Sequence, residues 1–200
     1  ARSATAAGIT VVVAAGNFGK SAAGKEVFGS VSSPGNDPSV ITVGAANFKG
    51  TTARSDDTVT MFSSRGPTRG GYVDAAGTRR VDNLIKPDLL APGNRVLGAA
   101  STTSAGNWNY LAATYYNDLV APANSAQYYY ESVMVMSGTS IAAPAVAGAA
   151  ALLLQANPGL TPPLVKAILQ YTAQPIAGQS LVHQGAGLLN VDGALAGGRS

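Results

Sequence analysis

The segment ITVVVAAGN at residues 9–17 constrains the fold most strongly, because it is a continuous run of apolar and β-branched residues that ends in Gly-Asn. A run of this kind is typical of a strand that is buried on both faces of a parallel sheet. Two further runs, SVITVGA at 39–45 and SVMVMSG at 132–138, predict strands of the same type. Weaker strand candidates occur at 59–64 and 94–100.

Three segments predict helices. Residues 140–156 are apolar on every face, as expected of a helix that runs through a core, and Pro158 ends it. A second helix at 161–172 begins with Thr as its cap and has two prolines in the first turn, where no backbone hydrogen bond is lost. A third is predicted at 188–196. Buried strands mixed with helices predict an α/β fold whose mostly parallel sheet is flanked by helices.

Composition narrows the class of protein. The 200 residues suggest one domain or a large part of one, and with 46% hydrophobic and 12% charged residues a compact core is expected. The absence of Cys excludes disulfides, thiolate metal sites and a cysteine nucleophile. The longest apolar run, 141–154, is shorter than the about 20 residues of a membrane span and is interrupted by Pro144. No membrane span is therefore predicted.

Two stretches have the composition of insertions, at residues 68–85 and 101–131. Turn residues interrupt both, so surface loops or short hairpins are predicted, although the tyrosines at 128–130 could instead line a peptide groove. Four basic residues in and just before the first stretch alternate with Asp74 and Asp82, and no aromatic or groove motif accompanies them, which favours a solvated loop over nucleic-acid binding. These basic residues are Arg65, Arg69, Arg79 and Arg80.

Ser140 lies where a predicted strand ends at Gly138 and a helix begins. Pro144 would fall in the first turn of that helix and do no harm there. The positive end of a helix dipole, at the carboxyl ends of sheet strands, favours a developing anion. Taken alone, however, this position is that of an ordinary serine N-cap. The hydrolase motif G-x-S-x-G is not matched, because Ala142 stands at its last position.

The segment GTSIAAPAVAG at 138–148 resembles the nucleophile motif of the subtilisin-like serine proteases, or subtilases. VVVAAGN resembles the family segment that supplies the oxyanion-hole asparagine. Four further blocks resemble the family's in the family's order: SPGNDPSVITVGA, FSSRGP, KPDLLAPG and GAGLLNVDGAL. The related sedolisins carry aspartate at the oxyanion position, where this chain has Asn17. The resemblance covers nearly the whole chain and implies a three-layer subtilisin-like fold, present in part.

The resemblance implies a role for each matching residue. Ser140 would be the nucleophile, and Asn17 would bind the oxyanion together with the backbone N–H of Ser140. Thr139 would belong to the substrate-binding site. The residues expected to form one wall of the pocket for the residue before the cut are Ala14, Ala15 and Gly16. A plain turn role for Asn17 is the alternative.

A serine hydroxyl needs a base to become a good nucleophile. The chain has a single histidine, His183, which follows the serine, and an exposed loop position is expected for it. No segment resembles the family's DTG and HGT blocks, so residues 1–200 are interpreted as the C-terminal portion of the catalytic domain. The catalytic Asp and His are expected upstream, and this chain alone would hydrolyse peptides poorly. The alternatives are a non-catalytic split or pseudo-protease subunit, which binds peptide or has a structural role, and an unrelated serine hydrolase.

The resemblance also implies partners. The chemistry requires no cofactor, but structural calcium is possible at the loop 35–40, which matches a segment where some relatives bind a cation through backbone oxygens. The bond between Ser33 and Pro34 is predicted to be cis. A peptide or protein substrate and the missing N-terminal half are the expected partners, without nucleic acid. The protein is expected to be secreted, although no signal segment is recognisable in the chain.

Overall fold

The computed structural model describes residues 1–100, 111, 114–123 and 133–198. Its main sheet is centred on β2 (Ile41–Asn47). β2 pairs in parallel with β1 (Val12–Ala14) and β6 (Leu89–Pro92), and antiparallel with the short β3 (Thr58–Val59). The prediction of a mostly parallel sheet is therefore confirmed, and the fold is α/β.

β1 departs from the expected burial on both faces, because all three of its residues are only half-buried. In the described part of the chain, β1 pairs with β2 alone, with Val12 opposite Ile41, so its other edge has no neighbour. β2, which has strands on both sides, is buried from Ile41 to Ala46. The prediction of two-sided burial is correct for β2 and wrong for β1.

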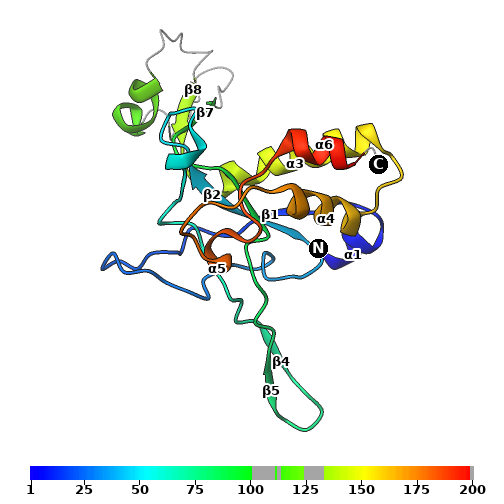
Figure 1. Ribbon diagram of the computed structural model, residues 1–200. Coiled ribbons are helices and arrows are strands. Elements are labelled where there is room, and N and C mark those ends of the chain that lie inside the picture. The colour runs from blue at the N-terminus through cyan, green and yellow to red at the C-terminus, as the bar shows by residue number, and fades with distance from the viewer. Residues whose placement is uncertain (101–110, 112–113, 124–132, 199–200) are drawn as a thin grey trace, which may run out of the picture.

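Three helices cover one face of the sheet: α3 (Thr139–Ala156), α4 (Pro162–Thr172) and α6 (Val191–Gly197) (Figure 1). Ile41 and Val43 of β2 belong to the same core cluster as buried residues of all three helices. Those helical residues are Ala142, Val146, Ala149, Ala150, Leu153, Val165, Leu169 and Ala194. α3 is long and apolar enough to cross a membrane, but the buried core helices of soluble proteins have the same length and composition.

The opposite face of the sheet is covered by the segment between α4 and α6. Ala46 and Leu90 form a second buried cluster with Ile176 and Leu188, against which Phe48 packs. The remaining helical elements are short. They are α1 (Arg2–Ala6), η1 (Arg54–Asp56), η2 (Tyr116–Val120), η3 (Ala121–Ala123) and α5 (Leu181–Gln184).

The helix boundaries differ in detail from the predicted ones. Thr161 is the N-cap residue of α4, as predicted, but its side chain makes no capping hydrogen bond. α6 begins three residues later than predicted, after Asn190, whose side chain accepts a hydrogen bond from the N–H of Gly193. In α3, Pro144 lies in the second turn and not in the first, because the helix already begins at Thr139.

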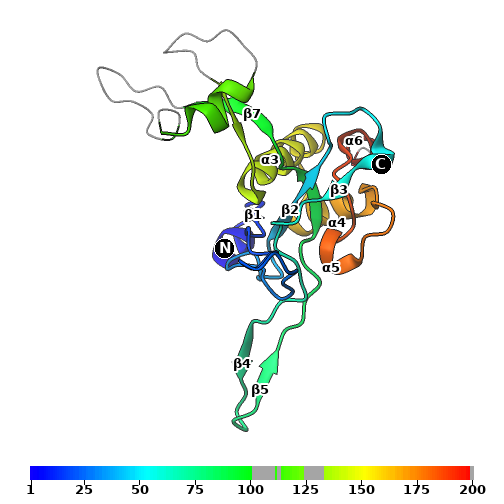
Figure 2. The ribbon, with the colours of Figure 1, turned by 90° about the vertical axis from the view of Figure 1, so that its left-hand side faces the viewer.

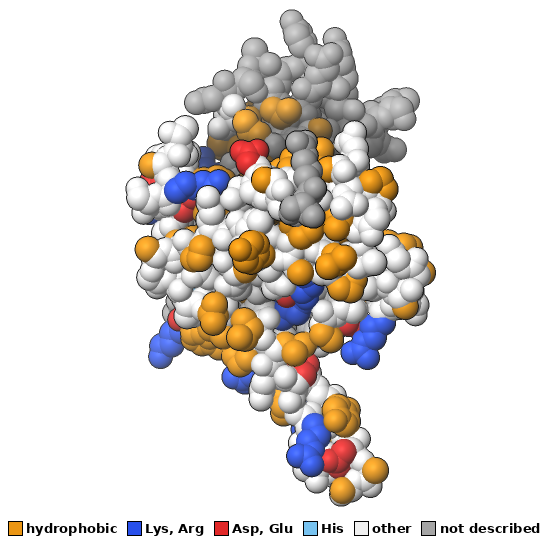
Figure 3. Space-filling model, turned by 45° about the vertical axis from the view of Figure 1, so that its right-hand side comes forward, with side chains coloured by type: hydrophobic (Ala, Val, Ile, Leu, Met, Phe, Trp, Pro, Cys, Tyr) orange, Lys and Arg blue, Asp and Glu red, His pale blue; other side chains and the backbone are white. Residues whose placement is uncertain are grey.

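Two antiparallel ribbons stand apart from the main sheet (Figures 1 and 2). β4 (Gly71–Val73) and β5 (Arg79–Val81) form a hairpin within residues 68–85. In Figure 3 this hairpin projects from the body and carries hydrophobic, basic and acidic side chains. Residues 128–130, the tyrosines considered for a peptide groove, lie outside the described residues.

The second ribbon pairs β7 (Val96–Ala99) with β8 (Val133–Met136). β8 was predicted as a buried strand of the parallel sheet, which is wrong. Its apolar side chains belong to a separate small cluster, in which Met134 packs with Ala100 and Val120. An apolar run predicts burial but does not specify which strand will be the partner.

Candidate active site

Ser140 is the second residue of α3, and Gly138 is the N-cap. The serine is exposed, and its hydroxyl has no hydrogen-bond partner among the residues that the structure describes. The N-cap explanation for Ser140 is therefore wrong. The hydroxyl faces solvent at the start of a helix, where backbone N–H groups are not used by the helix itself.

Gly138 brings two amide donors close together. Its φ is +150°, and a Cβ at this position would lie 3.3 Å from Nδ2 of Asn17 and 3.8 Å from the backbone N of Ser140. Both nitrogens thus approach one point beside the start of α3. Donors preorganised in this way can stabilise negative charge that develops on a substrate oxygen.

Thr139 determines how Asn17 is oriented. Oδ1 of Asn17 accepts hydrogen bonds from the backbone N–H of Thr139 at 2.9 Å and from its hydroxyl at 3.1 Å. Because the amide oxygen is occupied, the NH₂ group is the end of the side chain that has no hydrogen-bond partner among the described residues. Thr139 itself is fully buried. The sequence pointed to Thr139 only as a substrate-binding residue, so this orienting contact was missed.

The expected pocket wall lies directly beside this pair. The backbone N–H of Gly16 donates to Oγ1 of Thr139 at 3.1 Å. Gly16 has a φ of +105°, and a Cβ there would lie 2.6 Å from Oγ of Ser32 and 2.9 Å from Oγ of Ser64, so only glycine fits. Sequence reasoning missed both contacts: Ser64 lies in the family block FSSRGP, but nothing in the sequence indicates that it or Ser32 approaches Gly16. Ala14 is half-buried, and Ala15 is fully buried.

His183 does not occupy the exposed loop that was predicted. It lies in α5, its side chain is 17% exposed, and both of its ring nitrogens have partners. Nδ1 contacts Oγ of Ser180 at 2.5 Å, and Nε2 contacts Oε1 of Glu26 at 2.7 Å. The hydrogen bond from His183, with the nearby guanidinium of Arg65, holds the pKa of Glu26 below its usual range.

The prediction that Arg65 lies in a solvated loop is wrong. Arg65 was grouped with solvated loop arginines, but its side chain is 6% exposed and forms an ion pair with Glu26. Its guanidinium further donates to the carbonyl groups of Thr60 and Met61. Arg65 therefore belongs to the interior, whereas Arg69, Arg79 and Arg80 are exposed as expected.

The loop considered for calcium contacts two lysine ammonium groups. Nζ of Lys86 donates to the carbonyl of Val40 at 3.1 Å, and Nζ of Lys166 donates to the carbonyls of Pro38 and Val40 at 3.0 Å. Asp88 pairs with both lysines, at 2.6 and 3.0 Å. Burial lowers the pKa of Lys86 to about 8.

The peptide bond between Ser33 and Pro34, just before this loop, is cis, which confirms the prediction. The bonds before Pro67 and Pro87 are also cis and were not predicted. Within the described part of the chain, no cluster of three or more His, Cys, Asp or Glu side chains could hold a metal ion.

The α/β fold, with its mostly parallel sheet covered by helices, is the one that the resemblance implied, and the family comparison agrees. The model of the subtilase family, Peptidase_S8, matches residues 1–193, so the chain belongs to this family. The chain is 37% identical over 191 residues to the serine protease AprX of Bacillus subtilis (strain 168), covering 96% of this chain and 36% of AprX.

Further relatives are also subtilisin-like proteases. The subtilisin-like protease SBT2.4 of Arabidopsis thaliana is 36% identical over 115 residues, which cover 58% of this chain and 11% of that protein. Among solved structures, fervidolysin from Fervidobacterium pennivorans, a keratinolytic enzyme related to subtilisin, is 26% identical with a TM-score of 0.64. That match covers 96% of this chain and 23% of fervidolysin. The chain thus spans about a third of AprX and less of the other two proteins.

Proposed function

We propose that these residues form the C-terminal portion of a catalytic domain and that the complete protein is a serine endopeptidase. In this proposal Oγ of Ser140 attacks the carbonyl carbon of a peptide bond, and the resulting oxyanion accepts hydrogen bonds from Nδ2 of Asn17 and from the backbone N–H of Ser140. The hydroxyl proton passes through a general base to the leaving amine, which departs, and water then hydrolyses the acyl-enzyme to the peptide acid and free Ser140. The orientation of Asn17 by Thr139 is the observation that carries this proposal.

The proposal places the general base outside these 200 residues. His183 is the only histidine of the chain, and its ring nitrogens are committed to Ser180 and Glu26. The hydroxyl of Ser140 has no partner in the described part of the chain. A base and the acid that orients it must therefore come from another segment, for which the upstream part of the same protein is our candidate.

Two surfaces support such a partner segment. The edge of β1 that faces away from β2 has no neighbour in the described residues, and a free edge can pair with another strand. The outer side of α3 carries small exposed residues that would allow a second element to approach closely. These residues are Pro144, Ala145, Ala147, Gly148 and Ala151. We infer that the N-terminal half of the catalytic domain covers both surfaces.

The experiment compares the full-length protein with residues 1–200 expressed alone. Both are treated with a fluorophosphonate probe and assayed on casein, with Ser140→Ala as the test variant and Ser137→Ala, an exposed neighbour, as the control. We expect labelling and hydrolysis by the full-length protein, loss of both in Ser140→Ala, and no labelling of the short chain.

Two results would overturn parts of the proposal. Strong labelling of Ser140 in the short chain would show that a base exists within these residues. A folded full-length protein that binds peptides but is neither labelled nor active would establish the non-catalytic alternative. We further propose that the protein is secreted, which immunodetection in cell-free culture medium of the source organism would test.

A further inference from the structure

A cavity of about 250 Å³ lies between residues 54–57 and the segment that follows α4. Asp57, Arg54 and Gln174 contribute polar groups to its lining, and Ile176, Ala177 and Leu188 contribute an apolar wall. None of these residues belongs to the candidate active site. The cavity adjoins the cluster of Ile176 and Leu188 that covers the second face of the sheet.

Asp57 is the unusual member of this lining. The residue is 4% exposed, and its Oδ2 is buried without a hydrogen-bond partner among the described residues. Burial raises the pKa of its carboxyl group. Buried carboxylates in proteins are normally paired or hydrogen-bonded, because an isolated buried charge is strongly unfavourable. Oδ2 of Asp57 therefore lacks a hydrogen-bond donor among the described residues.

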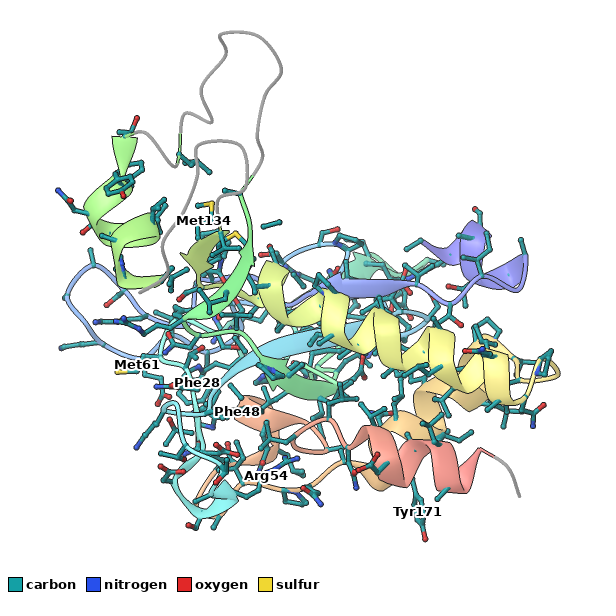
Figure 4. The ribbon with its side chains drawn as sticks, turned by 90° about the horizontal axis from the view of Figure 1, so that it is seen from above. Phe28, Phe48, Arg54, Met61, Met134 and Tyr171 are labelled. Carbon is teal, nitrogen blue, oxygen red and sulfur yellow. The ribbon has the colours of Figure 1, made fainter. Side chains whose placement is uncertain are left out.

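Arg54 acts on Asp57 as a nearby positive charge, which lowers the pKa of the carboxyl group less than burial raises it. The guanidinium carbon of Arg54 lies over the ring of Phe48, 5.8 Å from its centre (Figure 4). No ion pair joins Arg54 to Asp57 among the described residues. Asp56, the adjacent acid, accepts hydrogen bonds from the hydroxyl of Thr51 at 2.9 and 3.0 Å. Oδ2 of Asp57 is thus a buried acceptor beside this cavity that has no partner among the described residues.

We propose that the cavity binds a primary alkylammonium group, of the kind that ends a lysine side chain, with the ammonium at Asp57 and the alkyl stem against Ile176, Ala177 and Leu188. A compact monocation on an apolar stem matches one carboxylate beside an apolar wall. A divalent metal fits less well, because calcium takes six to eight oxygen ligands and the wall offers none. This inference is independent of the proposed protease function.

The test follows the melting temperature of the full-length protein that contains these residues during titration with n-butylammonium chloride. Sodium chloride at equal ionic strength and the neutral analogue 1-pentanol are the ligand controls. Asp57→Asn is the test variant, and Asp56→Asn is its matched control, because it neutralises the adjacent acid that does not line the cavity. We expect a saturable rise in melting temperature that is lost in Asp57→Asn, retained in Asp56→Asn and absent with either control ligand.

A second arm uses a lysine derivative blocked at both backbone ends, which distinguishes a side chain in a peptide from a free amine. Asp57→Asn is expected to fold, since it removes a buried charge. Should it fail to fold, Ala177→Phe, which fills the cavity and keeps the carboxylate, must abolish the response instead. An unchanged response in the folded Asp57→Asn variant, a response to sodium chloride alone, or a response to calcium chloride without one to butylammonium would overturn the proposal.

Discussion

Asn17 and Thr139, which are 122 positions apart in the chain, are joined by two hydrogen bonds that both end on Oδ1 of the asparagine. The bonds come from the backbone N–H and the hydroxyl of Thr139. Oγ1 of the same threonine also accepts the N–H of Gly16. One buried hydroxyl therefore connects the start of α3 to the segment that carries the candidate oxyanion donor.

Removing this hydroxyl should reduce catalysis by the full-length protein. Thr139→Val keeps the shape of the side chain but deletes one bond to Asn17 and leaves the N–H of Gly16 unpaired. A net loss of about 1.4 kcal/mol corresponds to about tenfold in rate, so we expect kcat to fall about tenfold with a small change in KM. Steady-state kinetics on a peptide substrate measures both. Thr139→Ser, which restores the hydroxyl, should recover most of kcat, and equal activity of the two variants would contradict the orienting role.

Asp37 should make stability depend on pH in the acid range. Partial burial disfavours its charge, but hydrogen bonds from the backbone and hydroxyl of Ser39, with the contribution of Arg2, outweigh this effect and lower the pKa of Asp37 to about 2. Because the folded-state pKa is below the ordinary value of 3.8, the stabilisation is complete above about pH 4 and is lost as pH falls toward 2. Its size is about 2 kcal/mol.

Urea unfolding of the wild type and Asp37→Asn at several pH values between 2 and 5 measures this contribution. The difference in free energy of unfolding between the two proteins should shrink as pH falls. A difference that stays constant across this range would contradict the assignment to Asp37.

Asp88 should contribute more to stability than its partner Lys86. Asp88→Asn leaves Lys86 and Lys166 without their shared carboxylate and should cost about 3–5 kcal/mol, as expected when one partner of a buried ion pair is removed. Lys86→Met should cost much less, because Asp88 keeps Lys166 and the N–H of Thr42 as partners. Chemical denaturation at neutral pH compares the two variants, and a larger loss in Lys86→Met would contradict this view.

Lys86 should also make the stability of the protein depend on pH. The folded-state pKa of Lys86 is about 8, below the ordinary 10.5, so the unfolded chain binds more protons between these values. The contribution of Lys86 to stability should therefore rise as pH increases from about 8 to 10.5. Lys86→Met should lack this rise in denaturation experiments over that range, whereas the exposed-lysine control Lys25→Met should retain it.

The loop 35–40 should not require calcium, because ammonium groups already contact the carbonyls of Pro38 and Val40. In the double variant Lys86→Ala/Lys166→Ala these oxygens and the carboxylate of Asp88 are released. We expect calcium chloride to raise the melting temperature of this variant more than that of the wild type. A double replacement of the exposed Lys20 and Lys25 by Ala is the control, and a larger calcium response in the wild type than in the test variant would refute the expectation.

The sequence by itself was enough to predict the local and motif-level features. The apolar, β-branched run around Val43 predicted a central buried strand because the period and residue type of such a run reflect burial directly. Thr161 and the two prolines after it marked the start of α4, and the motif around Ser140 indicated the family. These signals depend on residues close together in the chain, so they can be recognised without knowing the fold.

Features that depend on residues far apart in the chain could not be predicted and are seen only in the folded structure. β1 and β8 have similar apolar sequences, yet one joins the parallel sheet and the other an antiparallel ribbon, because pairing is determined by the neighbouring strand. Ser140 carries the motif, but only packing shows that Thr139 orients Asn17. His183 could not be placed from sequence either, since its contact with Glu26 spans 157 positions. A side chain's chemistry is local, whereas its partner, its burial and its orientation are properties of the folded chain.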